Sequence, residues 1–177
     1  MNKVITFCID IVKSYPFEGS CYSDLSPRLK AKQAIMNIKN RDNECFRWAL
    51  RAWKFPFHQG GHSDRPSKYP SEDGFDFSGI DFPVKLNQIP KIDQQNNLAI
   101  NVFAWGENRV LRVYASEQPE GLERINLMLI TNERRNSLYC FVKNLSHLLH
   151  PKKIHAYPLP LRRLLAKLLQ SRKSKRT

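Results

Sequence analysis

Residues 45–53 alternate apolar and polar positions at the spacing of an amphipathic helix. The apolar members of this segment are Cys45, Phe46, Trp48, Ala49, Leu50, Ala52 and Trp53. Asp42 and Asn43 precede it, and short polar side chains of this kind cap helix N-termini. Pro56 follows it, and proline stops a helix because it lacks a backbone N–H. We therefore predict a helix over residues 44–53 with Cys45 in its first turn.

Four short apolar runs in the second half of the chain have the composition of β-strands. They cover residues 98–105, 110–114, 124–130 and 138–142. The turn-forming sequence Gly-Glu-Asn at 106–108 predicts that the first two form a hairpin. Because the four runs follow the helix and have short links, we predict an α+β fold with a mostly antiparallel sheet.

The segments around this body carry weaker patterns. Residues 31–38 fit either a strand or a helical turn, and residues 56–79, rich in Pro, Gly, Ser and His, predict a long surface loop. Residues 80–84 fit an extended piece, and residues 86–94 a short helix interrupted by Pro90. We divide the chain into an N-terminal extension, an α+β domain and a tail, at residues 1–30, 31–150 and 151–177.

Composition predicts an intracellular protein, cytoplasmic or nuclear. The 177 residues are 41% hydrophobic and 25% charged, as in a globular protein that buries its own core. The apolar stretch within residues 1–17 is broken by Asp10, Lys13 and Pro16, so it predicts neither a secretory signal nor a membrane span. The four cysteines, which contain no C-x-x-C pair and are expected to stay reduced, are Cys8, Cys21, Cys45 and Cys140.

Positive charge is concentrated at the C-terminal end. Of the net charge of +13, residues 151–177 contribute nine Lys and Arg and no acid, which leaves only +4 for the rest. Such a tail predicts contacts with nucleic-acid phosphates, and its leucines also fit an amphipathic helix for a membrane surface or a partner groove. A solvated end of the chain is the alternative. The predicted phosphate contacts are Lys152, Lys153, Arg162, Arg163, Arg172, Lys173, Lys175 and Arg176.

Cys45 is the candidate nucleophile. The unpaired N–H groups and positive dipole end of a helix N-terminus lower the pKa of a thiol and can stabilise an oxyanion. Asp42 and Asn43, just upstream, can add polar partners. A cysteine in an amphipathic helix is nevertheless more often a small core residue.

The pattern Asp42-x-x-Cys45-Phe46 resembles the nucleophile segment of ovarian-tumour-type (OTU) deubiquitinases, a branch of the papain-like peptidases. The stretch from Ala34 to Leu149 also resembles a segment of proteins encoded by Maverick/Polinton-type transposons and related viruses. In that family the segment lies upstream of a cysteine-rich finger, an endonuclease or a family B DNA polymerase. The motifs that carry this likeness include 37–46, 79–86, 101–103, 125–130 and 140–149.

Two positions depart from this family. A histidine commonly precedes the tyrosine of its last strand, where this chain has Leu138 before Tyr139, and another precedes its Ile-Asn-Leu strand, where this chain has Arg124. A cysteine nucleophile needs an imidazole within hydrogen-bond reach. The resemblance thus implies a papain-like, OTU-like pseudoenzyme with a catalytic set of Cys45, Asp42 and Asn43, in which position 138 lines the thiol's cleft without its histidine.

Three functions remain open at this point. The first is peptide or protein binding by a degenerate peptidase module derived from a mobile element. The second is a DNA-associated accessory fragment of a transposon replication protein, acting through the basic tail. The third is an active cysteine peptidase that uses another base, for which His147 is the nearest candidate.

Histidine and cysteine clusters do not predict a metal site. His58 and His62 fit a glycine-rich surface loop better than a zinc site, since no thiol lies nearby. Cys140, His147, His150 and His155 form a looser set, in which the cysteine belongs to a strand. We expect no metal and no cofactor, and the sequence makes no prediction of oligomeric state.

Overall fold

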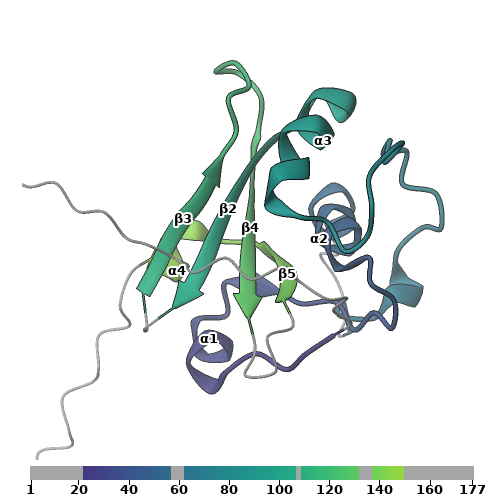
Figure 1. Cartoon of the computed structure of the whole chain (residues 1–177). Helices are drawn as coiled ribbons and strands as arrows, with labels where there is room; N and C mark the ends of the chain where they lie inside the picture. The colour runs from purple at the N-terminus through teal and green to yellow at the C-terminus, as the bar shows by residue number, and fades with distance from the viewer. Residues whose placement is uncertain (1–21, 57–61, 107–108, 132–136, 150–177) are drawn as a thin grey trace, which may run out of the picture.

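A five-stranded mixed sheet forms the centre of the molecule in a computed structural model of the chain (Figure 1). The structure describes residues 22–56, 62–106, 109–131 and 137–149. The strand order is β1-β5-β4-β2-β3. The strands are β1 Ile35–Met36, β2 Ala99–Gly106, β3 Arg109–Ala115, β4 Arg124–Thr131 and β5 Ser137–Val142. The predicted α+β class is confirmed, because short helices and a mostly antiparallel sheet make up this body.

The sheet topology differs from a simple run of hairpins. The predicted β2–β3 hairpin is confirmed, with Gly106 opposite Arg109. The next strand, β4, does not pair with β3. The connection from β3 passes the start of β2, and β4 then pairs in parallel with the other side of β2. The composition explains this order. Strand β4 buries Ile125 and the consecutive residues 127–129, so both of its faces are covered and it needs a central position in the sheet. Strand β3 exposes arginines and suits an edge.

Arg124 fastens the connection that makes this crossing. Its guanidinium donates hydrogen bonds to the backbone carbonyls of Ser116 and Gln118, at 3.3 and 3.0 Å. Both acceptors lie between β3 and β4, on the connection that passes the start of β2. Arg124 therefore has a structural role in this connection.

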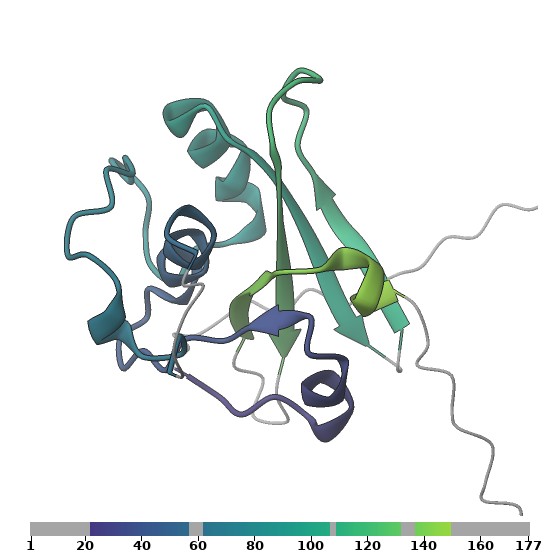
Figure 2. The ribbon, with the colours of Figure 1, turned by 180° about the vertical axis from the view of Figure 1, so that it is seen from behind.

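Helices lie on both sides of the sheet. Turning the molecule by 180° brings α4 in front of the sheet, whereas it lies behind the sheet in the first view (Figures 1 and 2). The Lys32 side chain joins α1 to α4 by donating to the Leu148 carbonyl at 2.6 Å. The helices are α1 Pro27–Lys32, α2 Cys45–Lys54, α3 Ile89–Asn96 and α4 Leu145–Leu149, with 3-10 turns η1 Pro66–Lys68 and η2 Leu86–Gln88.

The helix prediction for residues 44–53 is confirmed by α2, and Cys45 is its first residue. Pro90 does not interrupt a helix as expected. It lies in the first turn of α3, where a missing N–H costs nothing because that N–H has no intrahelical acceptor. Within residues 80–84, expected to be an extended piece, Phe82 and Pro83 form a bend and no strand is present. The boundary expected at residue 30 falls inside α1, whose Leu29 is buried, so the folded body begins before it.

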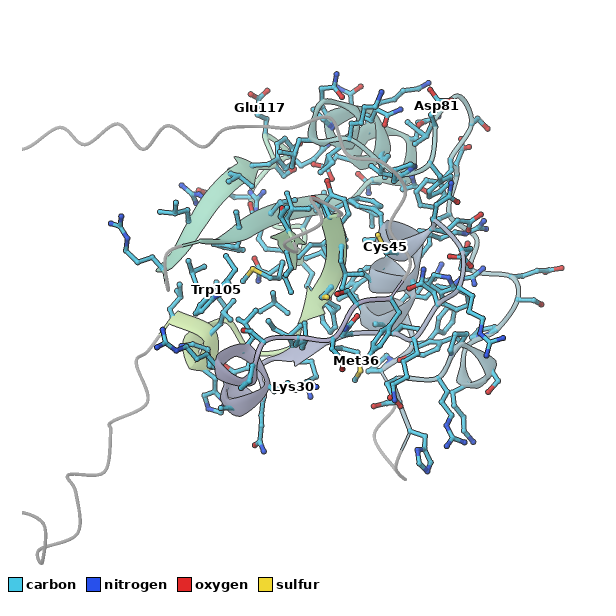
Figure 3. The ribbon with its side chains drawn as sticks, turned by 60° about the horizontal axis from the view of Figure 1, so that its bottom comes forward. Lys30, Met36, Cys45, Asp81, Trp105 and Glu117 are labelled. Carbon is cyan, nitrogen blue, oxygen red and sulfur yellow. The ribbon has the colours of Figure 1, made fainter. Side chains whose placement is uncertain are left out.

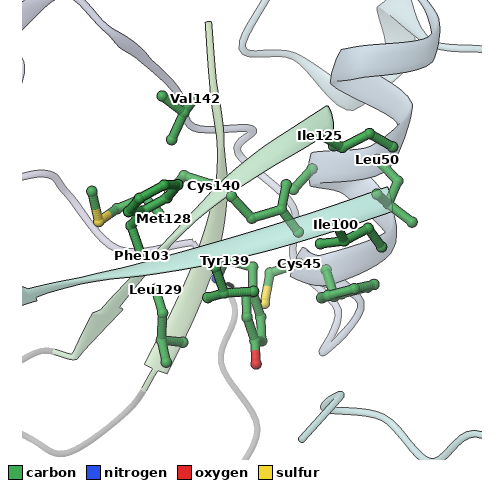
Figure 4. Packing of buried hydrophobic residues seen from close by; sticks show 14 of the residues in the cluster. Cys45, Leu50, Ile100, Phe103, Ile125, Met128, Leu129, Tyr139, Cys140 and Val142 are labelled. Carbon is green, nitrogen blue, oxygen red and sulfur yellow. Dashed lines mark hydrogen bonds between the residues drawn. The ribbon is translucent and has the colours of Figure 1, made fainter. Parts of the chain in front are cut away.

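Each face of the sheet buries its own set of apolar side chains (Figure 4). Leu50 of α2 lies with Ile100 and Tyr139 on one face, whereas Met128 and Val142 lie together on the other. Residues on alternate positions of a strand point to opposite faces. The core therefore has two layers, and a residue's position in the strand decides which helices it meets.

Asp73 anchors the long loop after α2 to the polar face of that helix. Arg47 Nε donates to Asp73 Oδ2 at 2.7 Å, and Arg51 Nε donates to the same oxygen. The Lys54 ammonium donates to the Asp73 backbone carbonyl at 2.6 Å. These three basic residues share one side of α2 because they are spaced by three or four positions. The loop predicted to lie on the surface thus contains a carboxylate with a fully buried side chain.

Burial by itself would raise the pKa of the Asp73 carboxyl. Hydrogen bonds from Arg47, the Phe75 N–H and Arg51 outweigh that effect and lower the pKa to about 2, from an ordinary value of 3.8. The carboxylate is therefore charged throughout the physiological pH range and holds both guanidinium groups in place.

We expect Asp73→Asn to lower the free energy of unfolding by about 3 kcal/mol or more, because two arginines lose the anion that they share in a buried site. Urea denaturation at neutral pH measures the loss. Asp24→Asn is the matched control, since it removes the partner of an exposed pair with Lys30 and should leave the midpoint nearly unchanged.

The same variant tests the acid dependence of stability. The folded chain binds the Asp73 proton more weakly than the unfolded chain, so the stabilisation is complete above about pH 4 and is lost as the pH falls toward about 2. Asp73→Asn should lose less stability than the parent over that interval. An equal loss in both proteins would assign the acid sensitivity to other carboxylates.

Candidate functional site

Cys45 lies in the core rather than at an open cleft. Its side chain is only 2% exposed, and its Sγ accepts a hydrogen bond from the Tyr139 backbone N–H at 3.4 Å. Next to it, the rings of Phe46 and Tyr139 meet edge to face with centroids 5.0 Å apart. The predicted contact between the start of the helix and the final strand is therefore present, but it is a packed contact (Figure 4).

Leu138 directly precedes Tyr139, whose backbone N–H donates to the Cys45 thiol, and the expectation that position 138 lines the thiol's cleft stays a prediction. Tyr139 and Phe141 contact residues of α2 or share clusters with them, so the odd-numbered positions of β5 point toward that helix. The register with β4 is continuous from Ser137 to Phe141, so Leu138 points to the opposite face. The side chains of Leu138 and Tyr139 therefore lie on opposite faces of the sheet, while the Cys45 sulfur lies against the Tyr139 backbone N–H at the edge of β5.

Tyr139 is the β5 side chain that lies beside the thiol. It is 4% exposed, and its hydroxyl has no hydrogen-bond partner among the described residues. Burial, followed by the nearby Cys45, raises the pKa of the Tyr139 phenol above its ordinary value. A phenol with a raised pKa keeps its proton, so Tyr139 cannot serve as the base that activates a nucleophile.

His147, the alternative base, belongs to α4 and has an exposed side chain. Cys45 is buried at the start of α2, which lies beside β5, whereas α4 lies behind β2 and β3 in the first view, and the two helices lie apart in both views (Figures 1 and 2). Proton transfer requires hydrogen-bond reach or one bridging water. The two side chains do not meet this condition.

Asp42 and Asn43 shape the loop that leads into α2. Asp42 Oδ1 accepts hydrogen bonds from the Glu44 N–H at 3.0 Å and from Asn40 Nδ2 at 2.9 Å, and the Trp48 indole donates to both carboxylate oxygens. Burial opposes ionisation of Asp42, but the bonds from Trp48, Asn40 and Glu44 lower its pKa overall. Asn43 Nδ2 donates to the Phe82 carbonyl at 3.2 Å. The structure thus uses both residues to hold the loop, whereas the resemblance assigned them to catalysis.

A cavity of about 570 Å³ lies at the opposite end of α2. Its buried and half-buried lining consists of Met36, Ala52, Trp53 and Phe141, which come from β1, α2 and β5. Its exposed rim consists of Lys54, Pro56, Glu123 and Lys143. In Figure 3, Cys45 and Met36 lie apart along the length of α2. Sequence analysis missed this cavity because its walls come from four separate segments, and no local pattern connects them.

A smaller cavity of about 290 Å³ borders Asp93. The Asp93 carboxylate accepts hydrogen bonds from the Ile100 N–H and the Tyr114 hydroxyl, at 3.1 and 3.0 Å. Burial raises the pKa of Asp93 despite these bonds. Since both oxygens already have donors, Asp93 is best explained as a link between α3 and strands β2 and β3.

Other candidate sites from the sequence lie partly or wholly outside the described ranges. The predicted phosphate contacts of residues 151–177, together with Cys8, Cys21, His58, His150 and His155, fall outside them. Within the described part of the chain, no three His, Cys, Asp or Glu side chains gather closely enough to hold a metal ion. None of the helices described there is long and apolar enough to cross a membrane.

Comparisons with known proteins identify no relative of this chain. No family model matches it, no curated protein matches it, and no solved structure matches it.

The position of Leu138 can be tested by replacing it with histidine. We expect Leu138→His to destabilise the fold by about 1–3 kcal/mol, since it buries a polar ring in an apolar layer. It should leave the alkylation rate of Cys45 by iodoacetamide unchanged in the folded chain, as read by mass spectrometry. Leu138→Met, which preserves volume, is the control and should cost less than about 1.5 kcal/mol. Faster alkylation of Cys45 in the histidine variant would place the two side chains on one face.

Proposed function

We propose that this chain is a non-catalytic peptide- or protein-binding domain, derived from a mobile-element protein with a papain-like, OTU-like arrangement. The observation that carries the proposal is the environment of Cys45. Its sulfur is buried and accepts a backbone hydrogen bond from Tyr139, and the neighbouring position 138 carries a leucine. A thiol in that setting has neither access to a substrate nor the imidazole that hydrolysis requires.

The peptidase ancestry is supported by the order and contact of the elements. A helix that begins with a cysteine precedes the sheet, and its first turn packs against the last strand of that sheet. This is the arrangement that the motif resemblance implies. The difference from an active peptidase is chemical, because a protonated tyrosine lies beside the thiol where an active site needs a base.

Binding does not need the chemistry that is missing. A peptide site requires a concave apolar surface with a few polar groups that set its orientation. The cavity at the end of α2 has this composition, with apolar side chains inside and charged side chains at the rim. Loss of peptidase turnover is therefore compatible with a retained ability to bind chains.

Reactivity of Cys45 tests the proposal against an active peptidase. A ubiquitin- or peptide-based electrophile should leave Cys45 unmodified in the folded chain, with modification at least about tenfold faster in urea, because access to a buried thiol requires unfolding. Mass-spectrometric mapping separates Cys45 from the other three cysteines. Stoichiometric labelling of Cys45 in the folded chain, abolished by Cys45→Ser, would instead support an active cysteine peptidase.

A second candidate function is association with DNA, favoured by the distribution of charge. Nine of the 29 Lys and Arg lie in residues 151–177, which contain no acid, so the tail carries most of the net charge. Basic segments of this kind neutralise phosphates and release counterions without reading sequence. This is the role expected of an accessory fragment of a replication protein.

We expect the full chain to bind random duplex DNA with an affinity that falls steeply with salt, with a logarithmic slope of about −5. Fluorescence anisotropy over a range of salt concentrations measures the slope. Deleting residues 151–177 should abolish binding, and a variant of full length with its tail Lys and Arg changed to Gln should behave like the deletion. Undiminished binding by the truncated chain would show that the folded body, and not residues 151–177, contacts the DNA.

A further inference from the structure

We propose that the cavity at the C-terminal end of α2 binds an acidic peptide segment, which inserts one apolar side chain between α2 and β5. This inference rests on the proposed peptide-binding function and gives it a location and a ligand class. The volume of about 570 Å³ lies within the range of roughly 300–1,000 Å³ typical of ligand sites. It suits one large apolar side chain together with part of the flanking backbone.

The interior of the cavity is suited to an apolar anchor. Met36 and Phe141 face each other across the β1–β5 pair, and the α2 side adds Ala52 and Trp53. Methionine adapts its shape to different side chains, and tryptophan supplies a rigid wall with a polar edge. The Trp53 indole is held by its Nε1–H, which donates to Glu123 Oε1 at 3.2 Å. The aromatic wall is thus oriented before a ligand enters.

The rim favours an acidic ligand. It contains two lysines and one carboxylate, and the carboxylate of Glu123 already accepts the Trp53 hydrogen bond. The Lys54 ammonium donates to the Asp73 carbonyl and lies 4.7 Å from the Phe75 ring centroid, and Lys54 lines the cavity. Lys143 makes no ion pair with the other described residues. The local surplus is therefore positive.

Lys143 is the expected contact for the ligand carboxylate. The C-terminal end of α2 carries partial negative charge, which Lys54 offsets, so that side of the rim attracts an acid less strongly. Lys143 lies on the other side, just after β5, and its backbone N–H donates to the Ala34 carbonyl at 2.8 Å. This bond fixes the backbone from which the ammonium projects. An acidic residue next to the apolar anchor can reach it when the anchor is inserted.

Charge also argues against occupants from the same protein. The tail at residues 151–177 offers leucines, but its nine basic residues and absence of acids make it a poor match for a positive rim. A second copy of the chain carries a net charge of +13 and meets the same repulsion. An acidic partner segment avoids both penalties.

The test uses the full chain and short fluorescein-labelled peptides read by anisotropy. The probe has a central Leu flanked by Asp and Glu, and two comparison peptides replace either the Leu by Ser or the acids by Lys. The probe should bind most tightly. Lys143→Glu should weaken its binding by roughly three- to tenfold, as expected for reversal of one exposed charge contact. Lys85→Glu makes the same charge change at an exposed position that does not line the cavity, and should have no effect.

The outcomes separate the inference from the proposed function. Equal affinity for Lys143→Glu and Lys85→Glu, or tighter binding of the basic peptide, would overturn the inference while leaving a binding domain. Binding that emerges only after deletion of residues 151–177 would also overturn it, because the tail would then be the occupant. Failure of every member of a displayed random peptide library to bind would remove the proposed function itself.

Discussion

The packing of the first turn of α2 against strand β5 determines the chemical character of Cys45. Phe46 and Tyr139 meet edge to face in the core, and burial of each ring stabilises the fold by about 1.5–3 kcal/mol. Because Cys45 directly precedes Phe46, the same packing brings the thiol to the Tyr139 N–H. A nucleophile needs solvent access and a base, whereas this sulfur has a buried place and a backbone donor. The stability of the contact and the burial of the thiol have one physical origin.

The other long face of α2 is charged, and it organises the loop that follows. Arg47 and Arg51 share the buried carboxylate of Asp73, which draws residues 71–77 against the helix. The Phe77 ring then packs against Phe46 and Phe82. Apolar burial on one face and a shared ion pair on the other leave the last turn of α2 as the part of the helix that borders the cavity.

The two ends of α2 therefore differ in what they offer to a partner. The start is packed, with an acceptor sulfur and a protonated phenol, and the end opens beside β1 and β5 with a positive rim. The concave surface at the end of α2 is thus separate from the buried thiol at its start.

The helix at α2 and the hairpin of β2 and β3 could be predicted because each depends on contacts between residues close in sequence. Spacing of apolar side chains decides a helix, and the short link that begins at Gly106 decides a hairpin. The order of the strands could not be predicted this way. The pairing of β4 with β2 depends on which strand must be buried on both faces, and that is a property of the whole sheet.

The candidate site shows the same division. The sequence alone placed Cys45 at the start of a helix and Leu138 next to Tyr139 on the final strand. Only the tertiary structure decided that the thiol is buried against the Tyr139 backbone N–H and that the Leu138 and Tyr139 side chains lie on opposite faces of the sheet. Likewise, Met36, Trp53 and Phe141 acquire a common role only when β1, α2 and β5 come together. A cavity is made by the space between distant segments, which no local pattern of residues encodes.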